Sequence, residues 1–181
     1  MPADARPAFD FQPHLAGDLV DLRPMQASDW DGLYVVGSDP LVWALHPDRG
    51  RYRDDAFRAY FEEGLACGGA LTAVSRADGA VIGSSRYSTL YTQAGEVEIG
   101  WTFLVRAYWG GLYNGDVKRL MLDHAFRFVD HVVFRVGEHN LRSRRALEKI
   151  GAVLTDRSHT VTVAGQPSRH VFYAITRLER T

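Results

Sequence analysis

The stretch EVEIGWTFLVRAYWGGLYNGDVKRLMLDHAFRFVDHVVFRV, residues 96–136, decides the fold of this 181-residue chain. Its first part, residues 96–105, predicts a strand. A glycine turn at Trp109–Gly111 follows, and apolar residues at a period of 3.6 then predict a helix over about 116–130. The continuous apolar run at 132–136 predicts a buried strand. A strand, a helix and a second strand in this order indicate a crossover unit with a parallel strand pair.

The strand at 96–105 is expected to carry different side chains on its two faces, because successive residues of a strand point in opposite directions. Acidic or small residues occupy one face: Glu96, Glu98 and Gly100. Large apolar residues occupy the other: Val97, Ile99, Trp101 and Phe103.

The segments around this unit add further strands and helices. On the N-terminal side we expect a strand at Leu19–Pro24, a helix opened by Ser28–Asp31, a helix at Asp54–Ala66, and a hairpin of Ala70–Ser75 and Val81–Tyr87. On the C-terminal side we expect a helix at Asn140–Ile150 and strands near Thr160–Val163 and His170–Ile175. This order predicts an α+β (mixed α/β) fold whose sheet contains both parallel and antiparallel pairs.

Composition limits the classes of protein to which the chain can belong. Its length fits one domain, and 46% apolar residues suffice for a core. A formal net charge of −1 argues against a general nucleic-acid binder, so we expect no nucleic-acid partner. Of the 21 basic residues only Lys118 and Lys149 are lysines.

Other classes of site are disfavoured by what the sequence lacks. A single cysteine, Cys67, excludes an internal disulfide and a cysteine-type zinc site. His124, His131 and His139 lack metal-ligand spacing, so no metal is expected. No apolar run reaches the length of a membrane span, and we expect a cytoplasmic protein without a membrane partner. Residues 1–15 are interpreted as a surface arm.

Two features indicate an anion site. The glycine turn before the helix at 116–130 would present free backbone N–H groups at the positive end of the helix dipole. Three arginines (Arg142, Arg144 and Arg145) crowd the first turns of the helix at 140–150, where the dipole disfavours cations. The alternatives are a simple tight turn and a solvated face paired with nearby acids.

The segment EHNLRSRRALEKIGA, residues 138–152, resembles the E-x-N-x-x-S-x-x-A-x-E-K-x-G-A/F segment of the GNAT superfamily of acyl-CoA-dependent N-acyltransferases. It is most similar to the branch that contains the ribosomal-protein N-terminal acetyltransferases. Val97–Trp101 resembles the E-I-G-Y/W strand of that branch, and Leu22–Pro24 resembles its first strand. The order and spacing of these motifs match from about Leu19 to Leu178.

The resemblance implies a fold and a co-substrate. It implies a single GNAT-like domain over residues 1–181, with a twisted mixed sheet of about six or seven strands and about four helices. It also implies acetyl-CoA as co-substrate and no metal. The residues that would bind acetyl-CoA are Phe103, Leu104, Val105, Trp109, Gly110, Gly111, Leu112, Tyr113, Asn114, Asn140, Ser143 and Arg145, with Arg142 as an alternative to Arg145 for a nucleotide phosphate.

The phosphate loop departs from the family pattern at two positions. Leu112 stands where glycine is usual, and Asn114 stands where glycine or alanine is usual. Glycine at such a position permits a close approach of backbone to phosphate. A weakened or lost cofactor site is therefore the alternative reading of this loop.

The resemblance also implies a reaction and a catalytic carboxylate. An amine is protonated at neutral pH and must lose a proton before it attacks a thioester. Glu98 matches the position often given to the base, and Glu96 is the second choice. Either could instead be an ordinary solvent-facing strand residue. The position of a frequent tyrosine acid is Leu147 here, so the thiolate would leave without a dedicated acid.

The sequence therefore predicts an N-acetyltransferase that transfers an acetyl group to a primary amine by direct attack in a ternary complex. The amine would be a protein N-terminus or a small molecule, in a pocket lined by Trp43, His46, Tyr52 and Arg53. A non-catalytic acyl-CoA-binding or sensory module of the same fold is the alternative. A third reading is an interaction protein whose arginine cluster contacts RNA. A homodimer is possible.

Overall fold

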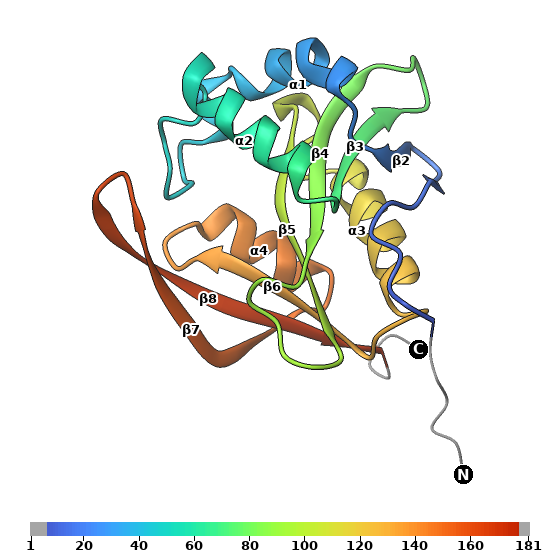
Figure 1. The fold of residues 1–181 in the computed structure, drawn as a ribbon, viewed down its shortest axis with the longest axis vertical. Coiled ribbons are helices and arrows are strands. Elements are labelled where there is room, and N and C mark those ends of the chain that lie inside the picture. Colours follow the sequence, from blue (N-terminus) through green and yellow to red (C-terminus); the bar gives the residue numbers. More distant parts are fainter. Residues whose placement is uncertain (1–6, 178–181) are drawn as a thin grey trace.

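The computed structural model describes residues 7–177 as one mixed sheet with helices on both faces (Figure 1). The strands are β1 (Leu15–Ala16), β2 (Val20–Pro24), β3 (Ala70–Ser75), β4 (Val81–Ser88), β5 (Glu96–Leu104), β6 (His131–Gly137), β7 (Val153–Val163) and β8 (Gln166–Thr176). The α-helices are α1 (Trp30–Gly37), α2 (Asp54–Ala66), α3 (Leu112–Ala125) and α4 (Leu141–Lys149).

The sheet order is β1-β2-β3-β4-β5-β6-β8-β7, and β5–β6 is its parallel pair while the other pairs are antiparallel. The crossover from β5 to β6 through α3 confirms the strand–helix–strand prediction. The sheet has one strand more than the upper expected count, because the two residues of β1 pair with β2. The last two strands are longer than predicted and form a hairpin that twists away from the sheet (Figure 1).

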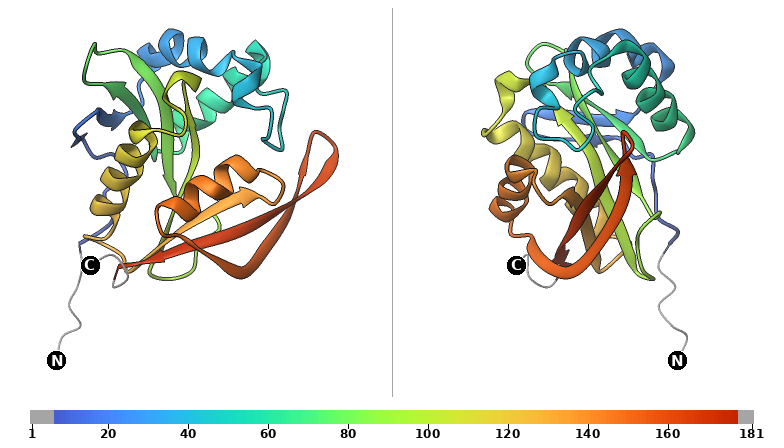
Figure 2. Two further views of the ribbon diagram at one scale, coloured as in Figure 1. Left: turned by 180° about the vertical axis from the view of Figure 1, so that it is seen from behind. Right: turned by 90° about the vertical axis from the view of Figure 1, so that its left-hand side faces the viewer.

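Two apolar clusters lie on opposite faces of the sheet. α3 and α4 pack on one face, where Met121 and Leu147 join Val97 and Phe134 in the larger cluster. α1 and α2 pack on the other face, where Leu33 and Phe57 join Phe103. The side view in Figure 2 shows α3 and α4 on the opposite side of the sheet from α2. We call these the α3 face and the α2 face.

A β-bulge in β5 changes which side chains reach each face. Pairing with β4 moves from Ser84↔Phe103 to Arg86↔Gly100, and Trp101 takes a φ of 52°. A positive φ is unusual for a bulky residue, and an extra residue in one strand reverses the side-chain alternation beyond it. Trp101 and Phe103 therefore lie on the α2 face. The prediction that both share a face with Val97 was wrong.

The parallel pairing of β5 with β6 is short. Glu96, Val97 and Glu98 pair with His131, Val132 and Val133. Beyond these three pairs, both strands continue without pairing to each other in the described chain, to Leu104 and to Gly137. The two strands thus open into a wedge whose vertex is at Glu98. This is the opened strand edge that the family resemblance implies.

The two ends of α3 differ from the prediction. The helix begins at Leu112, because Gly111 serves as its N-cap, and it ends at Ala125. Residues 126–129 form turns that close on Ala125, His124 and Leu122 instead of continuing the helix. The earlier start brings the first helical turn up to the glycine turn.

Residues 7–14 run along the outside of the α3 face, and residues 1–6 of the expected arm lie outside the described residues. The described part is anchored by aromatic contacts. The Phe9 ring lies 5.1 Å from that of Tyr87 and 5.2 Å from that of Phe128. Asp10 presents its carbonyl oxygen to His124 Nε2 at 2.8 Å. This segment therefore packs against the core and also forms part of the protein surface.

Candidate functional site

Glu98 lies at the vertex of the wedge and is the most buried acidic side chain near it. Its residue is 1% exposed, on the α2 face of β5. The guanidinium Nε of Arg135, on the neighbouring strand β6, lies 3.5 Å from Oε1. No described group donates a hydrogen bond to Oε2. A carboxylate with one free oxygen at the vertex of two diverging strands is placed to accept a proton.

Burial raises the pKa of the Glu98 carboxyl above its ordinary value, and the positive charge of Arg135 opposes that rise. Desolvation disfavours the charged form of an acid, whereas a nearby cation favours it. A base works best when its pKa approaches the operating pH. The environment of Glu98 therefore shifts this carboxyl in the direction that base catalysis needs.

Glu96, the second predicted candidate, is held by other groups. Both carboxylate oxygens lie 3.0 Å from Arg157 Nη1 of β7, and Oε2 accepts a hydrogen bond from the Gln93 backbone N–H at 2.8 Å. These contacts join the start of β5 to the last hairpin. Glu96 acts as a structural link in this arrangement, and Glu98 is the better candidate for the base.

A chain of charged and aromatic groups extends from Glu98 across the α2 face. The Arg135 guanidinium lies 5.7 Å from the Trp101 ring centroid, and that of Arg86 lies 4.8 Å from it. Arg86 also donates to Glu63 Oε1 of α2 at 2.8 Å. Alternating cations and π faces of this kind attract each other in a partly desolvated site. Arg135 is not among the predicted site residues, although it is the one charged residue in the apolar run 132–136.

A pocket of about 420 Å³ adjoins this chain of groups. Its wall includes Glu63, Arg86 and Trp101, with Leu90 and Phe11 on other sides. The pocket therefore brings together the C-terminal half of α2 and the strands β4 and β5. Glu63, Arg86 and Trp101 lie on the same face of the sheet as Glu98, which makes this pocket the candidate acceptor site, while Phe11 and Tyr87 belong to the apolar cluster of the α3 face.

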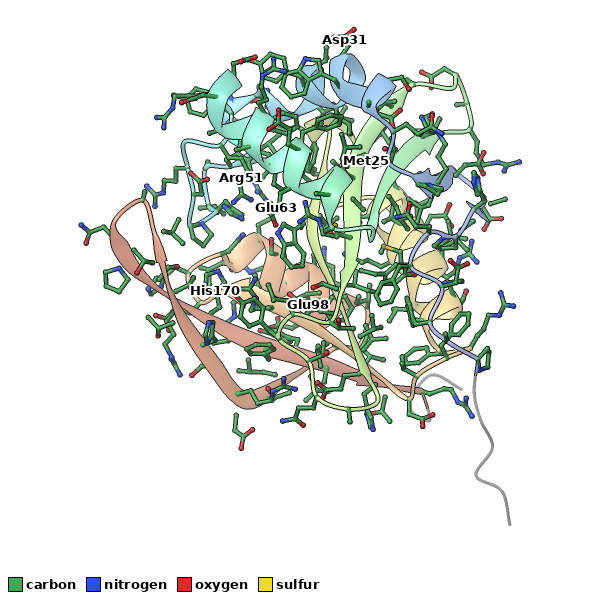
Figure 3. All side chains as sticks on the ribbon, in the orientation of Figure 1. Met25, Asp31, Arg51, Glu63, Glu98 and His170 are labelled. Carbon is green, nitrogen blue, oxygen red and sulfur yellow. The ribbon has the colours of Figure 1, made fainter. Side chains whose placement is uncertain are left out.

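The segment between α1 and α2 contacts the end of β6, where a Cβ built on Gly137 would meet Pro47, and the start of α4, where Arg142 donates to the Val42 carbonyl. Figure 3 shows Arg51 and Glu63 above Glu98 and His170, around the space between α2 and the β7–β8 hairpin. Burial is the main cause that lowers the pKa of His46 to about 3, with Arg51 adding to it. Burial also lowers the pKa of His170, and Arg135 lowers it further. Both imidazoles are therefore neutral at neutral pH.

The predicted pocket residues divide between core and surface. Trp43 is 3% exposed and donates its indole N–H to the Gly37 carbonyl at 2.7 Å, so it belongs to the α2-face core. His46 is held by the Asp48 backbone N–H at 3.0 Å. Tyr52 and Arg53 are exposed on the way into α2. Of these four, His46 is close enough to His170 and Arg142 for their charges to lower its pKa.

The N-terminus of α3 lies on the opposite, α3 side of the wedge. Its N-cap is Gly111, no side chain caps its first turn, and that turn holds no acidic residue. Gly110 has a φ of 68°, a left-handed conformation that favours glycine. A Cβ built on Gly110 or Gly115 would meet no atom within 4 Å. The free N–H groups of this turn therefore face open space, as a diphosphate site requires.

The two unusual residues of the loop do not distort this turn. Leu112 lacks a positive φ, so its backbone is not strained by the absence of glycine, and its side chain is exposed. Asn114 is a helical residue of the first turn of α3. Tyr113 stacks on Tyr108 with ring centroids 3.9 Å apart, and Trp109 donates its indole N–H to the Leu104 carbonyl at 2.9 Å. The aromatic residues fix the turn between the end of β5 and α3.

The start of α4 lies beside this turn, but its arginines have different surroundings. Asn140 caps the helix through Oδ1, which accepts from the Ser143 N–H at 3.3 Å. Arg142 lies over the Trp109 ring at 3.9 Å and donates to the Val42 carbonyl. Arg144 instead binds the Tyr173 hydroxyl. Arg145 is exposed. The structure thus brings Arg142 to the glycine turn, while the described contacts tie Arg144 to the sheet.

A buried amine in the wedge is also absent from the predicted site residues. Lys118 of α3 is 6% exposed, and its Nζ donates to Thr102 Oγ1 of β5 at 2.6 Å. The signal was present in the sequence, since Lys118 is one of two lysines and stands between Val117 and Met121 on the apolar face of the predicted helix.

The described residues hold no cluster of three or more His, Cys, Asp or Glu suited to a metal ion. Within the same range of 7–177, no helix is long and apolar enough to cross a membrane.

Comparisons with known proteins agree with this fold. The family model described as Acetyltransferase (GNAT) domain matches residues 20–153. An acetyltransferase of the GNAT family from Bacillus anthracis is 17% identical, with a TM-score of 0.74 over 91% of this chain and 98% of that chain. An N-acetyltransferase from Brucella melitensis is 16% identical, with a TM-score of 0.81 over 96% of this chain and 81% of that chain.

A third similar structure contains a coenzyme A derivative. It is RimJ from Mycobacterium smegmatis in complex with CoA-disulfide, 20% identical, with a TM-score of 0.68 over 92% of this chain and 87% of that chain. At these identities the likeness shows the fold. No curated protein matches the chain significantly in sequence.

Proposed function

The chain belongs to the GNAT acetyltransferase family, and on that premise we propose that it is an acetyl-CoA-dependent N-acetyltransferase acting on a primary amine. The family transfers an acyl group from acyl-CoA to an amine. The observation that carries the proposal is the end of β5–β6 pairing at Glu98. It places a candidate base at the vertex of a wedge, with an uncapped helix N-terminus on one side and a pocket on the other.

The residues present fit an acyl-CoA. The donor's diphosphate suits the free N–H groups from Gly110 to Asn114, where no acidic side chain opposes it. The pantetheine suits the unpaired backbone of β5 around Phe103, Leu104 and Val105. The start of α4, with Asn140, Ser143 and Arg142 or Arg145, closes the site. When bound, the donor supplies an activated acyl carbon and a thiolate leaving group.

The residues of the α2 face would prepare the acceptor. The pocket beside Trp101 admits an amine, and Glu98 Oε2 takes the proton that the nitrogen must lose. Arg135 keeps that carboxyl partly ionised and fixes its orientation from β6. The acceptor would be a protein N-terminus, as in the branch whose motif the chain resembles, or a small-molecule amine.

The proposal predicts binding and turnover in the full chain. Acetyl-CoA at 100 times its dissociation constant should raise the free energy of unfolding by about 2.7 kcal/mol, which a thermal-shift assay detects. A panel of primary amines, including peptides with a free N-terminus, should then release free thiol only in the presence of the enzyme. A non-catalytic acyl-CoA-binding module would show the thermal shift without thiol release, and the absence of both would overturn the proposal.

A further inference from the structure

The proposed function gives no task to the most deeply buried amine of the described chain, that of Lys118. Its Nζ donates to Thr102 Oγ1 on β5 and lies 5.6 Å from the centroid of the Phe134 ring on β6. Thr102 and Phe134 belong to the two strands that have separated beyond Glu98. The amine therefore lies between these strands, in the wedge, on the α3 face.

The surroundings of Lys118 contain hydroxyls and apolar groups. β5 contributes the Thr102 hydroxyl, which also bonds to Ser85 Oγ of β4 at 2.7 Å, and β6 contributes the Phe134 ring. On α3 itself the nearest acid along the chain, Asp116, is directed elsewhere, because it accepts from Leu19 and Val20 N–H groups. No described ion pair involves Lys118.

Such burial costs stability, because an amine buried without an opposite charge loses hydration that an apolar leucine or methionine in its place would not lose. Here burial lowers the pKa of Lys118 to about 7, and no described charge adds to that shift. Strongly shifted groups concentrate at functional sites, and this one lies in the wedge where the donor's thioester would end.

We infer that Lys118 is the acid that protonates the sulfur of the acyl donor as it leaves. The inference rests on the proposed function. Leu147 of α4, which packs in the same core, has no proton to give. Lys118 instead carries its proton into the wedge from α3, opposite the side on which Glu98 receives one.

The step balances in atoms and electrons. The acceptor nitrogen bonds to the thioester carbonyl carbon, the carbon–sulfur bond breaks, and its electron pair stays on sulfur. Lys118 Nζ gives a proton to that sulfur, and Glu98 takes one from the acceptor nitrogen. The products are an amide and a free thiol, and proton exchange with water returns Lys118 and Glu98 to their starting forms. An alkyl thiol has a pKa of about 8.5, so a group that titrates near 7 can protonate its thiolate.

Replacement of Lys118 by methionine tests this role, with the other lysine as a matched control. Lys118→Met should lower kcat by about 10²-fold and leave the dissociation constant of acetyl-CoA within about threefold. It should also abolish the alkaline limb of the kcat–pH profile, because that limb reports loss of the acid's proton. Lys149→Met, on the exposed end of α4, should retain the wild-type values.

A second readout does not depend on activity. With lysine isotopically labelled at Cε, NMR of the wild type gives signals from only two side chains, which Lys149→Met assigns. The Lys118 signal should titrate near pH 7. Coenzyme A should shift it, whereas desulfo-coenzyme A, which lacks the sulfur, should not. This experiment stands even if Lys118→Met fails to fold.

The outcomes separate this inference from the function on which it rests. A wild type that turns over, with a Lys118→Met variant of equal kcat and an unchanged alkaline limb, overturns the role of Lys118 alone. Equal shifts with coenzyme A and desulfo-coenzyme A do the same. A wild type that neither binds acetyl-CoA nor releases thiol overturns the proposed function and this inference together.

Discussion

The two faces of β5 differ in whether their charged groups have partners of opposite charge. On the α2 face each arginine near Glu98 has a carboxylate partner: Arg86 with Glu63, Arg135 with Glu98 and Arg157 with Glu96. On the α3 face, the first turn of α3 holds no acid, and Lys118 has a hydroxyl as its partner. These arginines are therefore paired with acids, while the N-terminus of α3 and Lys118 have no acidic partner among the described contacts.

This difference follows from what each face would bind. An anionic donor supplies its own negative charge, so a positive α3 face gains a partner when the donor arrives. The amine acceptor must instead lose a proton to a carboxylate. The pairing of Glu98 with Arg135 keeps this carboxylate from forming a permanent ion pair with the amine.

The largest expected effect comes from removal of the base on the α2 face. Glu98→Gln keeps the size of the side chain and removes its ability to take a proton, so kcat should fall by about 10²–10⁴-fold while acetyl-CoA binding persists. Since the pKa of Glu98 is raised, the wild-type rate should climb with pH above the usual glutamate range near 4.3, and the variant should lose that climb. Steady-state thiol release from pH 5 to about 9 measures both.

Glu96→Gln provides the comparison for this variant. It breaks the link of Glu96 to Arg157 and should lower the melting temperature slightly, with kcat changed only a few-fold. Equal losses of kcat in the two variants would mean that the α2 face needs its charge balance and not a specific base.

The sequence predicted the elements around the start of α3 better than the contacts of the α2 face. The glycine turn, the cap Asn140 and the crossover unit are local signals, because turns and caps depend on residues next to one another. The order of the helices and strands followed from periodicity alone. Leu112 remains a departure from the family's phosphate loop, although its φ is not positive and its side chain is exposed.

The rest depended on tertiary contacts that no local pattern contains. The bulge at Trp101 arises from the register between β4 and β5, and it moved Trp101 and Phe103 to the α2 face. The early start of α3 was hidden because Gly115 and Asn114 have low helix propensity. Arg135 interrupts an apolar strand, but only its packing against Glu98 shows the reason.

The second-largest expected effect is on the free energy of unfolding, and it concerns Lys118 on the α3 face. Lys118 binds its proton less tightly in the folded chain than in the unfolded chain, so wild-type stability should rise as the pH increases from about 7 towards 10.5. Lys118→Met removes the buried amine and should raise the free energy of unfolding at pH 7 by roughly 2–4 kcal/mol. This gain should shrink at alkaline pH. Urea unfolding at several pH values measures it, and an equal loss of stability at all of them would show that the lysine supports the core.

The smallest effect tests whether the positive end of α3 serves an anion. Leu112→Glu places a carboxylate in the exposed first turn, where it should stabilise the free protein by about 0.3–1 kcal/mol and weaken acetyl-CoA binding several-fold. Stability rises while acetyl-CoA affinity falls, because the new carboxylate occupies the place of the donor's negative charge. Leu112→Gln, the neutral control, should change neither. Calorimetric titrations at low and high salt measure the difference, which screening should reduce. Equal affinities of the Glu and Gln variants at low salt would mean that the donor's diphosphate lies elsewhere, and the contrast between the two faces would lose its functional meaning.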